Sequence, residues 1–153
     1  MRVIQGDLTV KSWWKIALVT SRFNSEITER LEAGAYERLI ELGVNPEQIA
    51  CVRVPGAVEI PFAVGRALTS EFDAAIALGA VIRGETSHYD YVCNAVERGC
   101  NQLMLEMKKP VVFGVLTTEN EQQAEARIGG EHGHKGREAA EVALEMLNLA
   151  DQF

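Results

Sequence analysis

The segment AAIALGAVIRGETSH, residues 74–88, decides the fold of this 153-residue chain. Its first part, 74–82, is entirely apolar or glycine, a pattern typical of a strand buried on both faces of a parallel sheet. The following residues, 83–88, are polar, and a helical pattern begins at about residue 89. A buried strand that leads through a polar loop into a helix is the repeating unit of an open α/β sheet.

Further units of the same kind lie on either side of this segment. Strands are expected at 15–20, 49–54, 74–82 and 111–116, with helices at 24–43, from 58, at 89–108, from 121 to near 129, and at 136–149. Asn24 or Ser25 is expected to cap the first helix, and Gly43 to end it. The alternation predicts an α/β fold with a parallel sheet of about four to five strands in a single domain, residues 1–153. Residues 1–10 are weakly patterned and either add a strand or pair with a neighbouring subunit.

Composition limits the possible partners. Of the residues, 47% are hydrophobic and 24% are charged, as in ordinary globular proteins, and the net charge of -7 argues against nucleic acid or an anionic membrane as partner. The longest apolar run is too short to cross a bilayer, and the N-terminal residues lack the apolar core of a signal peptide. The three cysteines have no metal-site spacing and are expected to be reduced. These features predict a cytoplasmic protein whose partners are small molecules.

Polar segments follow each predicted strand at the point where the strand ends. They are SRFN (21–24), PGAVE (55–59), RGETSH (83–88) and LTTEN (116–120). In open parallel sheets, ligands bind outside the carboxyl ends of the strands. The clustering of groups that hydrogen-bond, stack or titrate therefore predicts a binding site at this edge of the sheet.

The RGETSH segment admits two interpretations. The backbone NH groups of residues 85–87 would point outward at a helix N-terminus, where a phosphate binds well. Alternatively, Ser87 and Asp90 form an ordinary capping pair, and the segment alone does not separate the two. Arg127 and Lys135 are candidate cations for a bound phosphate, although for each residue alone an ordinary surface charge is the favoured interpretation.

Other residues of these segments suggest specific roles. His88 is suited to proton transfer near neutral pH, Glu59 to hydrogen bonds with a polyol, and Phe23 to stacking on a flat heterocycle. Their alternatives are a surface histidine, a first-turn carboxylate and a core aromatic. His132 and His134 resemble a metal pair, but no third ligand follows at suitable spacing, so a polar turn is favoured and no metal is expected. The residues alone predict an α/β enzyme that acts on a small phosphate-bearing substrate.

Several motifs in register extend this interpretation. The segments SRFN, VPGAVEIP, GAVIRGETSHYDYVCN, FGVLTTEN and AEARIGG, with GHKG after them, closely resemble the lumazine synthase family over nearly the whole chain. The resemblance implies a flavodoxin-like three-layer α/β sandwich. One departure lies in the stretch 129–136, where many family members carry GTKxGNKG: Glu131 replaces a lysine and His134 an asparagine.

The resemblance also implies roles for particular residues. His88 would transfer protons, and the phosphate would be held by Glu85 and Thr86, through their NH groups, and by Arg127. The pyrimidine and its ribityl chain would be bound by Phe23, Ala57, Val58, Glu59, Ala80, Val81 and Ile82, and by Phe113 of an adjacent subunit.

The implied reaction joins 5-amino-6-(D-ribitylamino)uracil to 3,4-dihydroxy-2-butanone 4-phosphate. An imine forms, phosphate is eliminated, and ring closure with loss of water gives 6,7-dimethyl-8-ribityllumazine, without a metal or an organic cofactor. Holding both reactants in one pocket supplies much of the acceleration. The alternatives are a riboflavin synthase of the related pentameric type, which has no phosphate substrate and so no use for this loop, and an inactive shell or carrier protein.

The resemblance implies a homo-oligomer as well. In the family the ring is a pentamer, and a short turn at 129–136 accompanies icosahedral shells of twelve pentamers, whereas insertions there accompany free pentamers. This chain has the short turn, so a shell is expected, with riboflavin synthase as a candidate partner.

Overall fold

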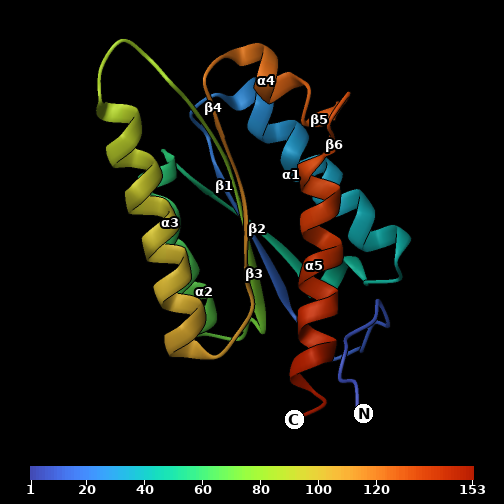
Figure 1. The fold of residues 1–153 in the computed structure, drawn as a ribbon. Helices are drawn as coiled ribbons and strands as arrows, with labels where there is room; N and C mark the ends of the chain where they lie inside the picture. The colour runs from blue at the N-terminus through green and yellow to red at the C-terminus, as the bar shows by residue number, and fades with distance from the viewer.

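Four parallel strands form the centre of the molecule in a computed structural model that describes all 153 residues (Figure 1). They are β1 (Ile16–Ser21), β2 (Ile49–Val54), β3 (Ala74–Ile82) and β4 (Val111–Thr118), in the spatial order β2-β1-β3-β4. Each strand pair is parallel and in continuous register. This order matches the first four strands of the flavodoxin-like α/β sandwich, the fold that the family resemblance implies.

Helices cover both faces of this sheet. In Figure 1, α1 (Ser25–Glu41) and α5 (Lys135–Ala150) lie on one face, and α2 (Ile60–Leu68) and α3 (His88–Met107) on the other. Short 3-10 turns precede β2 (Pro46–Gln48) and α2 (Ala57–Glu59). No helix has the length and apolar character needed to cross a bilayer.

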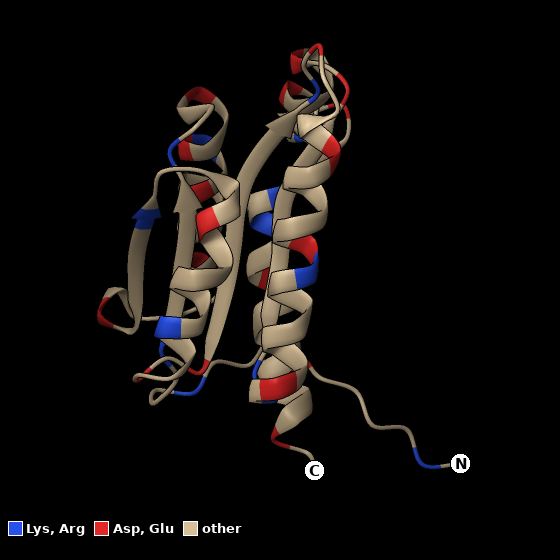
Figure 2. Cartoon of the chain, turned by 90° about the vertical axis from the view of Figure 1, so that its left-hand side faces the viewer, with Lys and Arg blue, Asp and Glu red and all other residues tan.

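The sheet separates two hydrophobic clusters. One joins alternate residues of β1 and β3 to α1 and α5, and the other joins the intervening residues of the same strands to α2 and α3. Charged residues lie on the helices and end loops (Figure 2), and Arg53 in β2 is the only charge within the four strands. β3 contacts both clusters, so it holds the two helix layers together.

Element boundaries differ from the predictions mainly near β4. This strand continues to Thr118, and the following helix α4 (Glu121–Glu125) ends four residues before the expected position. The chain then forms a hairpin of β5 (Ile128–Gly130) and β6 (Gly133–His134). Gly129 and Gly133 have φ of 105° and 74°, values that other residues rarely adopt, so the hairpin replaces the last helical turn.

Residues 1–10 form no strand within this chain, contrary to one of the two expectations for them. They run along α5, where the Asn148 amide donates hydrogen bonds of 2.8 Å to the carbonyls of Asp7 and Thr9. Leu8 and Val10 pack against the hydrophobic cluster beneath α1 and α5. The segment therefore follows a helix instead of the sheet edge.

His134 explains how the unusual 129–136 stretch starts α5. It occupies the N-cap position, and its Nδ1 atom accepts a hydrogen bond of 3.3 Å from the backbone NH of Arg137. The imidazole packs on Gly34 of α1, where a Cβ atom would come within 2.1 Å of the ring. Burial, and then the nearby Arg137 charge, lower the pKa of His134. An asparagine cap provides the same acceptor, so the substitution conserves the cap.

We predict that acid weakens this cap. Because folding lowers the pKa of His134, the unfolded chain binds the proton more readily, and stability is full above the usual value of 6.5 and falls below it. His134→Asn should reduce the fall in thermal midpoint between pH 7.5 and pH 5.5, because asparagine does not titrate. His134→Ala should cost about 1 kcal/mol at pH 7.5. Equal pH slopes for wild type and His134→Asn would contradict the role.

Candidate active site

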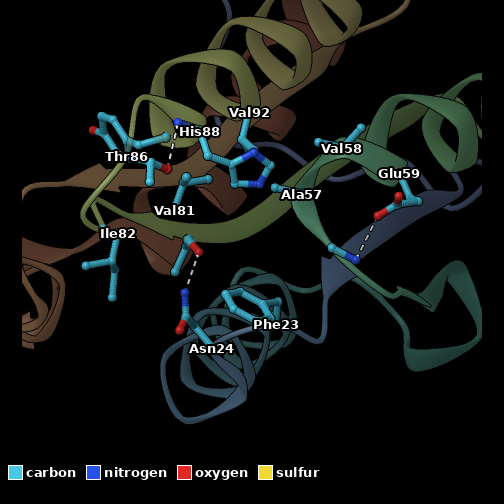
Figure 3. Close-up of a pocket in the computed structure, with 14 residues that line it drawn as sticks. Phe23, Asn24, Ala57, Val58, Glu59, Val81, Ile82, Thr86, His88 and Val92 are labelled. Carbon is cyan, nitrogen blue, oxygen red and sulfur yellow. Dashed lines mark hydrogen bonds between the residues drawn. The ribbon is translucent and has the colours of Figure 1, made fainter.

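A cavity of about 550 Å³ opens at the carboxyl ends of the first three strands (Figure 3). Its walls come from the turn after β1, the turn after β2, the end of β3 and the first turns of α3. The lining residues are Phe23, Asn24, Gly56, Ala57, Val58, Glu59, Ala80, Val81, Ile82, Gly84, Thr86, His88, Tyr89 and Val92. This position, between the ends of β1 and β3, is the topological switch point at which flavodoxin-like folds bind ligands.

Phe23 presents an aromatic ring at the mouth of the cavity. Its side chain is 71% exposed, which is unusual for phenylalanine, so the interpretation as a core aromatic is wrong. Backbone hydrogen bonds from Arg22 NH to Val54 O (2.8 Å) and from Phe23 NH to Pro55 O (3.1 Å) fix the chain beneath it. The backbone of Phe23 is thus fixed, and its exposed ring is available for stacking.

Asn24 joins two walls of the cavity. Its backbone is left-handed, with φ 60° and ψ 48°, and its Nδ2 atom donates a 2.9 Å hydrogen bond to the carbonyl of Ala80 (Figure 3). Asn24 occupies the N-cap position of α1, but neither it nor Ser25 caps the helix through its side chain. The side chain is used instead to tie the turn after β1 to β3.

The turn after β2 forms the opposite wall. The Gly56 NH donates a 2.9 Å hydrogen bond to Oε2 of Glu59, so the carboxylate stabilises its own turn (Figure 3). No protein hydrogen bond reaches Oε1, and Glu59 is exposed. One carboxylate oxygen therefore remains for a hydroxyl of a ligand, next to the buried Ala57 and the exposed Val58.

The loop 83–88 favours the anion interpretation over the capping one. Ser87 makes no cap hydrogen bond, and the carboxylate of Asp90 contacts Arg83 instead of reaching back to the helix start. The backbone NH groups of residues 84–87 donate no hydrogen bond within the chain. Because α3 is 20 residues long, its N-terminus adds a favourable dipole for an anion at these free NH groups.

Arg83 fixes this loop to β4. Its Nε donates a 2.6 Å hydrogen bond to Glu119, and its guanidinium lies 4.3 Å from the ring centre of Tyr89. The hydrogen bonds that Arg83 donates to Glu119 and Asp90 raise its pKa, while burial raises the pKa of Tyr89. The cation within the loop thus contacts Glu119, Asp90 and Tyr89, and it does not line the cavity.

Not all the predicted site residues meet in this cavity. Phe113 and Arg127 line a second hollow of about 420 Å³ beyond β4, together with His132 and Lys135. The Arg127 guanidinium donates a 2.8 Å hydrogen bond to the carbonyl of Gln123. Glu85 lies between Gly84 and Thr86 but is not itself a lining residue. Consequently, no lysine or arginine of the chain lines the larger cavity.

Some lining residues were not predicted from the sequence. Tyr89 and Val92 belong to the first turns of α3, and Val92 follows His88 at the i,i+4 spacing that places two side chains on one helix face. That spacing is a signal that could have identified Val92. Gly56 contributes its backbone NH and Asn24 its side-chain amide to contacts that the sequence does not reveal.

The strand order and the cavity define an α/β protein of the flavodoxin-like type with a small-molecule site at the carboxyl edge of its sheet. The family model described as 6,7-dimethyl-8-ribityllumazine synthase matches residues 14–151. A relative of that name from Bdellovibrio bacteriovorus is 54% identical over 91% of this chain and 76% of its own length. Another from Coxiella burnetii is 51% identical over 94% and 95%, respectively. The chain belongs to the 6,7-dimethyl-8-ribityllumazine synthase family.

We predict that the link between Asn24 and Ala80 supports the cavity. Asn24→Gly keeps the left-handed conformation but loses the hydrogen bond, which should cost about 1 kcal/mol of unfolding free energy. Asn24→Ala should lose roughly a further 1 kcal/mol, because a Cβ atom disfavours this conformation. Chemical denaturation of the two variants measures both effects, and equal stability of Asn24→Ala and wild type would refute the link.

Proposed function

We propose that this chain condenses 5-amino-6-(D-ribitylamino)uracil with 3,4-dihydroxy-2-butanone 4-phosphate in the larger cavity, giving 6,7-dimethyl-8-ribityllumazine. As a member of its family, the chain is a transferase of riboflavin biosynthesis. The observation that carries the site assignment is that most of the residues implied by the resemblance line one cavity: Phe23, Ala57, Val58, Glu59, Ala80, Val81, Ile82, Thr86 and His88. Nothing in the site favours a riboflavin synthase or an inactive shell protein.

The pyrimidine is assigned to the apolar side of this cavity. The ring of Phe23 stacks on one face of the heterocycle, and the end of β3, Ala80 to Ile82, lines its edge. The ribityl chain lies along Ala57 and Val58, where the free oxygen of Glu59 accepts a hydroxyl hydrogen bond. The flat ring and the polyol therefore occupy chemically different walls.

The phosphate is assigned to the loop 83–88. The free NH groups of Glu85 and Thr86 and the α3 dipole stabilise an anion there, but a phosphate dianion also calls for a cation. None lines the cavity within one chain. We assign that cation to Arg127 of an adjacent subunit, together with Phe113, because both line the same separate hollow.

His88 is assigned the proton transfers. Figure 3 shows its imidazole directed into the cavity from the start of α3. In the proposed sequence the pyrimidine amine adds to the ketone and water leaves, giving an imine. Loss of a carbon-bound proton then allows phosphate to depart with its bonding electrons, and the second nitrogen closes the ring with loss of water. An imidazole can accept and return these protons near neutral pH.

A site shared between subunits implies a closed ring. Exposed aromatic and aliphatic side chains on α2 and α3, among them Phe62, Tyr91 and Leu105, offer apolar area for a subunit contact. The outer edges of β2 and β4 are also unpaired. We propose a pentamer, and, because the turn from Gly129 to Gly136 is short, a shell of twelve pentamers with riboflavin synthase as a candidate partner.

We predict that Arg127→Ala weakens the phosphate-bearing substrate selectively. A charge-assisted hydrogen bond to phosphate contributes about 1.5 to 3 kcal/mol, or roughly ten- to a hundredfold in KM for the butanone phosphate. The KM for the pyrimidine should change little. Steady-state kinetics that follow lumazine fluorescence and released phosphate give both values, and equal losses for the two substrates would remove Arg127 from the phosphate site.

A subunit-mixing experiment tests whether the site is shared. Chains with Arg127→Ala and chains with Phe23→Ala/His88→Ala should each form defective sites when assembled alone. When the two are unfolded together and reassembled as mixed rings, roughly a quarter of the sites receive both intact halves, because each half is intact in one chain of two. Activity should return to about that level. Activity no higher than that of the separate variants, or an active monomer in sedimentation, would contradict the shared site.

A further inference from the structure

A third hollow, of about 290 Å³, is lined only by polar and charged residues. It lies at the carboxyl end of β1 and the start of α1, beside the edge strand β2. The lining residues are Thr20, Ser21, Arg22, Ser25, Thr28, Glu29 and Arg53, none of which lines the active-site cavity. The proposed reaction uses none of these groups, so their arrangement calls for a separate explanation.

Two residues that line this hollow carry buried hydroxyl groups with no hydrogen-bond partner in the protein. Thr20 is 3% exposed and Thr28 is 1% exposed, and Oγ1 of each is unpaired. Thr20 shares a strand face with Ile16 and Leu18, which pack against α1, so both hydroxyls lie between the sheet and that helix. A buried hydroxyl without a partner is destabilising, and native proteins rarely leave two together. The hydroxyl of Ser21 is also unpaired, but it lies next to Gly79 on the other sheet face.

The charged groups around these hydroxyls fit a small anion. The guanidinium of Arg22 makes no ion pair or hydrogen bond, whereas Arg53 is paired with the buried Glu32 at 2.6 Å. Because the side chain of Asn24 bonds Ala80, the backbone NH groups of Ser25 and Glu26 at the N-terminus of α1 remain free. Cationic, hydroxyl and NH donors therefore gather at one place.

Glu29 determines which anion fits. Its carboxylate lines the same hollow and makes no ion pair. It would repel an anion that has only acceptor oxygens, but it can accept a hydrogen bond from an anion that carries an OH group. Inorganic phosphate keeps at least one P–OH group at neutral pH. Sulfate has none, and a phosphomonoester, whose second pKa is about 6, has mostly lost its own.

We propose that this hollow is a second anion site, selective for inorganic phosphate over sulfate and phosphomonoesters. Thr20, Thr28 and Arg22 donate to the phosphate oxygens, and the P–OH group donates to Glu29. Inorganic phosphate is also the leaving group in the proposed reaction, but the hollow is defined by its own donors and does not depend on that reaction.

Equilibrium dialysis of the assembled protein with labelled inorganic phosphate tests this site. All variants are made in the Arg127→Ala chain, so that phosphate binding in the active site is weakened and the hollow can be measured separately. Arg127 does not line the hollow. In that background, Thr20→Val/Thr28→Val should weaken the remaining phosphate site about tenfold or more, because each lost donor to a charged group is worth roughly that factor. Valine is nearly isosteric with threonine, so the thermal midpoint without phosphate should not fall. Thr69→Val, which removes a hydroxyl bonded to Gly65 on α2, is the matched control and should bind as the background does.

Glu29→Gln gives a second, surface-exposed variant. It should weaken phosphate binding and allow sulfate to compete, whereas sulfate should not displace phosphate from the hollow with Glu29 intact. Two results would overturn the proposal: unchanged phosphate binding in Thr20→Val/Thr28→Val, or equal competition by sulfate in Glu29→Gln and in the protein with Glu29 intact. The buried hydroxyls would then have only water as a partner. If Arg127→Ala lowers phosphate binding and the two threonine substitutions cause no further loss, the proposal is overturned and the active-site assignment is supported. If Arg127→Ala leaves phosphate binding unchanged and the threonine substitutions then remove a site, the hollow is supported and the phosphate role of Arg127 is refuted.

Discussion

Burial of β3 on both faces is the constraint on which the rest of the structure depends. Residues Ala74 to Leu78 are fully buried, and they contact α1 and α5 on one side and α2 and α3 on the other. A polar side chain buried in such a strand costs free energy unless it has a hydrogen-bond partner. The polar residues of this segment therefore lie after the end of the strand. The carboxyl end of β3 therefore lines the candidate active-site cavity and leads into the loop with free NH groups.

The candidate site of one chain contains no cation that is free to meet an anion. Arg83, the cation within the loop 83–88, contacts Glu119, Asp90 and Tyr89, and it does not line the cavity. Arg127 lies beyond β4 in a different hollow. Because the free NH groups of the loop 83–88 and the guanidinium of Arg127 lie in different hollows of one chain, we assign function to an assembly and not to a single subunit.

Much of the fold could be predicted from short-range patterns. The strand 74–82 and the helices that follow the strands were anticipated closely, because periodicity and apolar runs depend on neighbours in the sequence. The errors occurred where a local signal competed with a distant contact. Asn24, for example, gives its side chain to Ala80 instead of capping α1. For the loop 83–88 the sequence left two interpretations open, and the contact of Asp90 with Arg83 argues against the capping one. α4 ends early because the glycine hairpin after it packs near α1 and α5.

The sequence by itself determined the order of strands and helices, the polar loops at the strand ends, and the family to which the chain belongs, since these depend on residue types at short spacing. Only the tertiary structure decided that Phe23, Glu59 and His88 share one cavity and that Arg127 lies outside it. It alone brought the unpaired hydroxyls of Thr20 and Thr28 together. The reason is physical: contacts between residues far apart in the chain arise from strand order and helix packing, which periodicity alone does not specify.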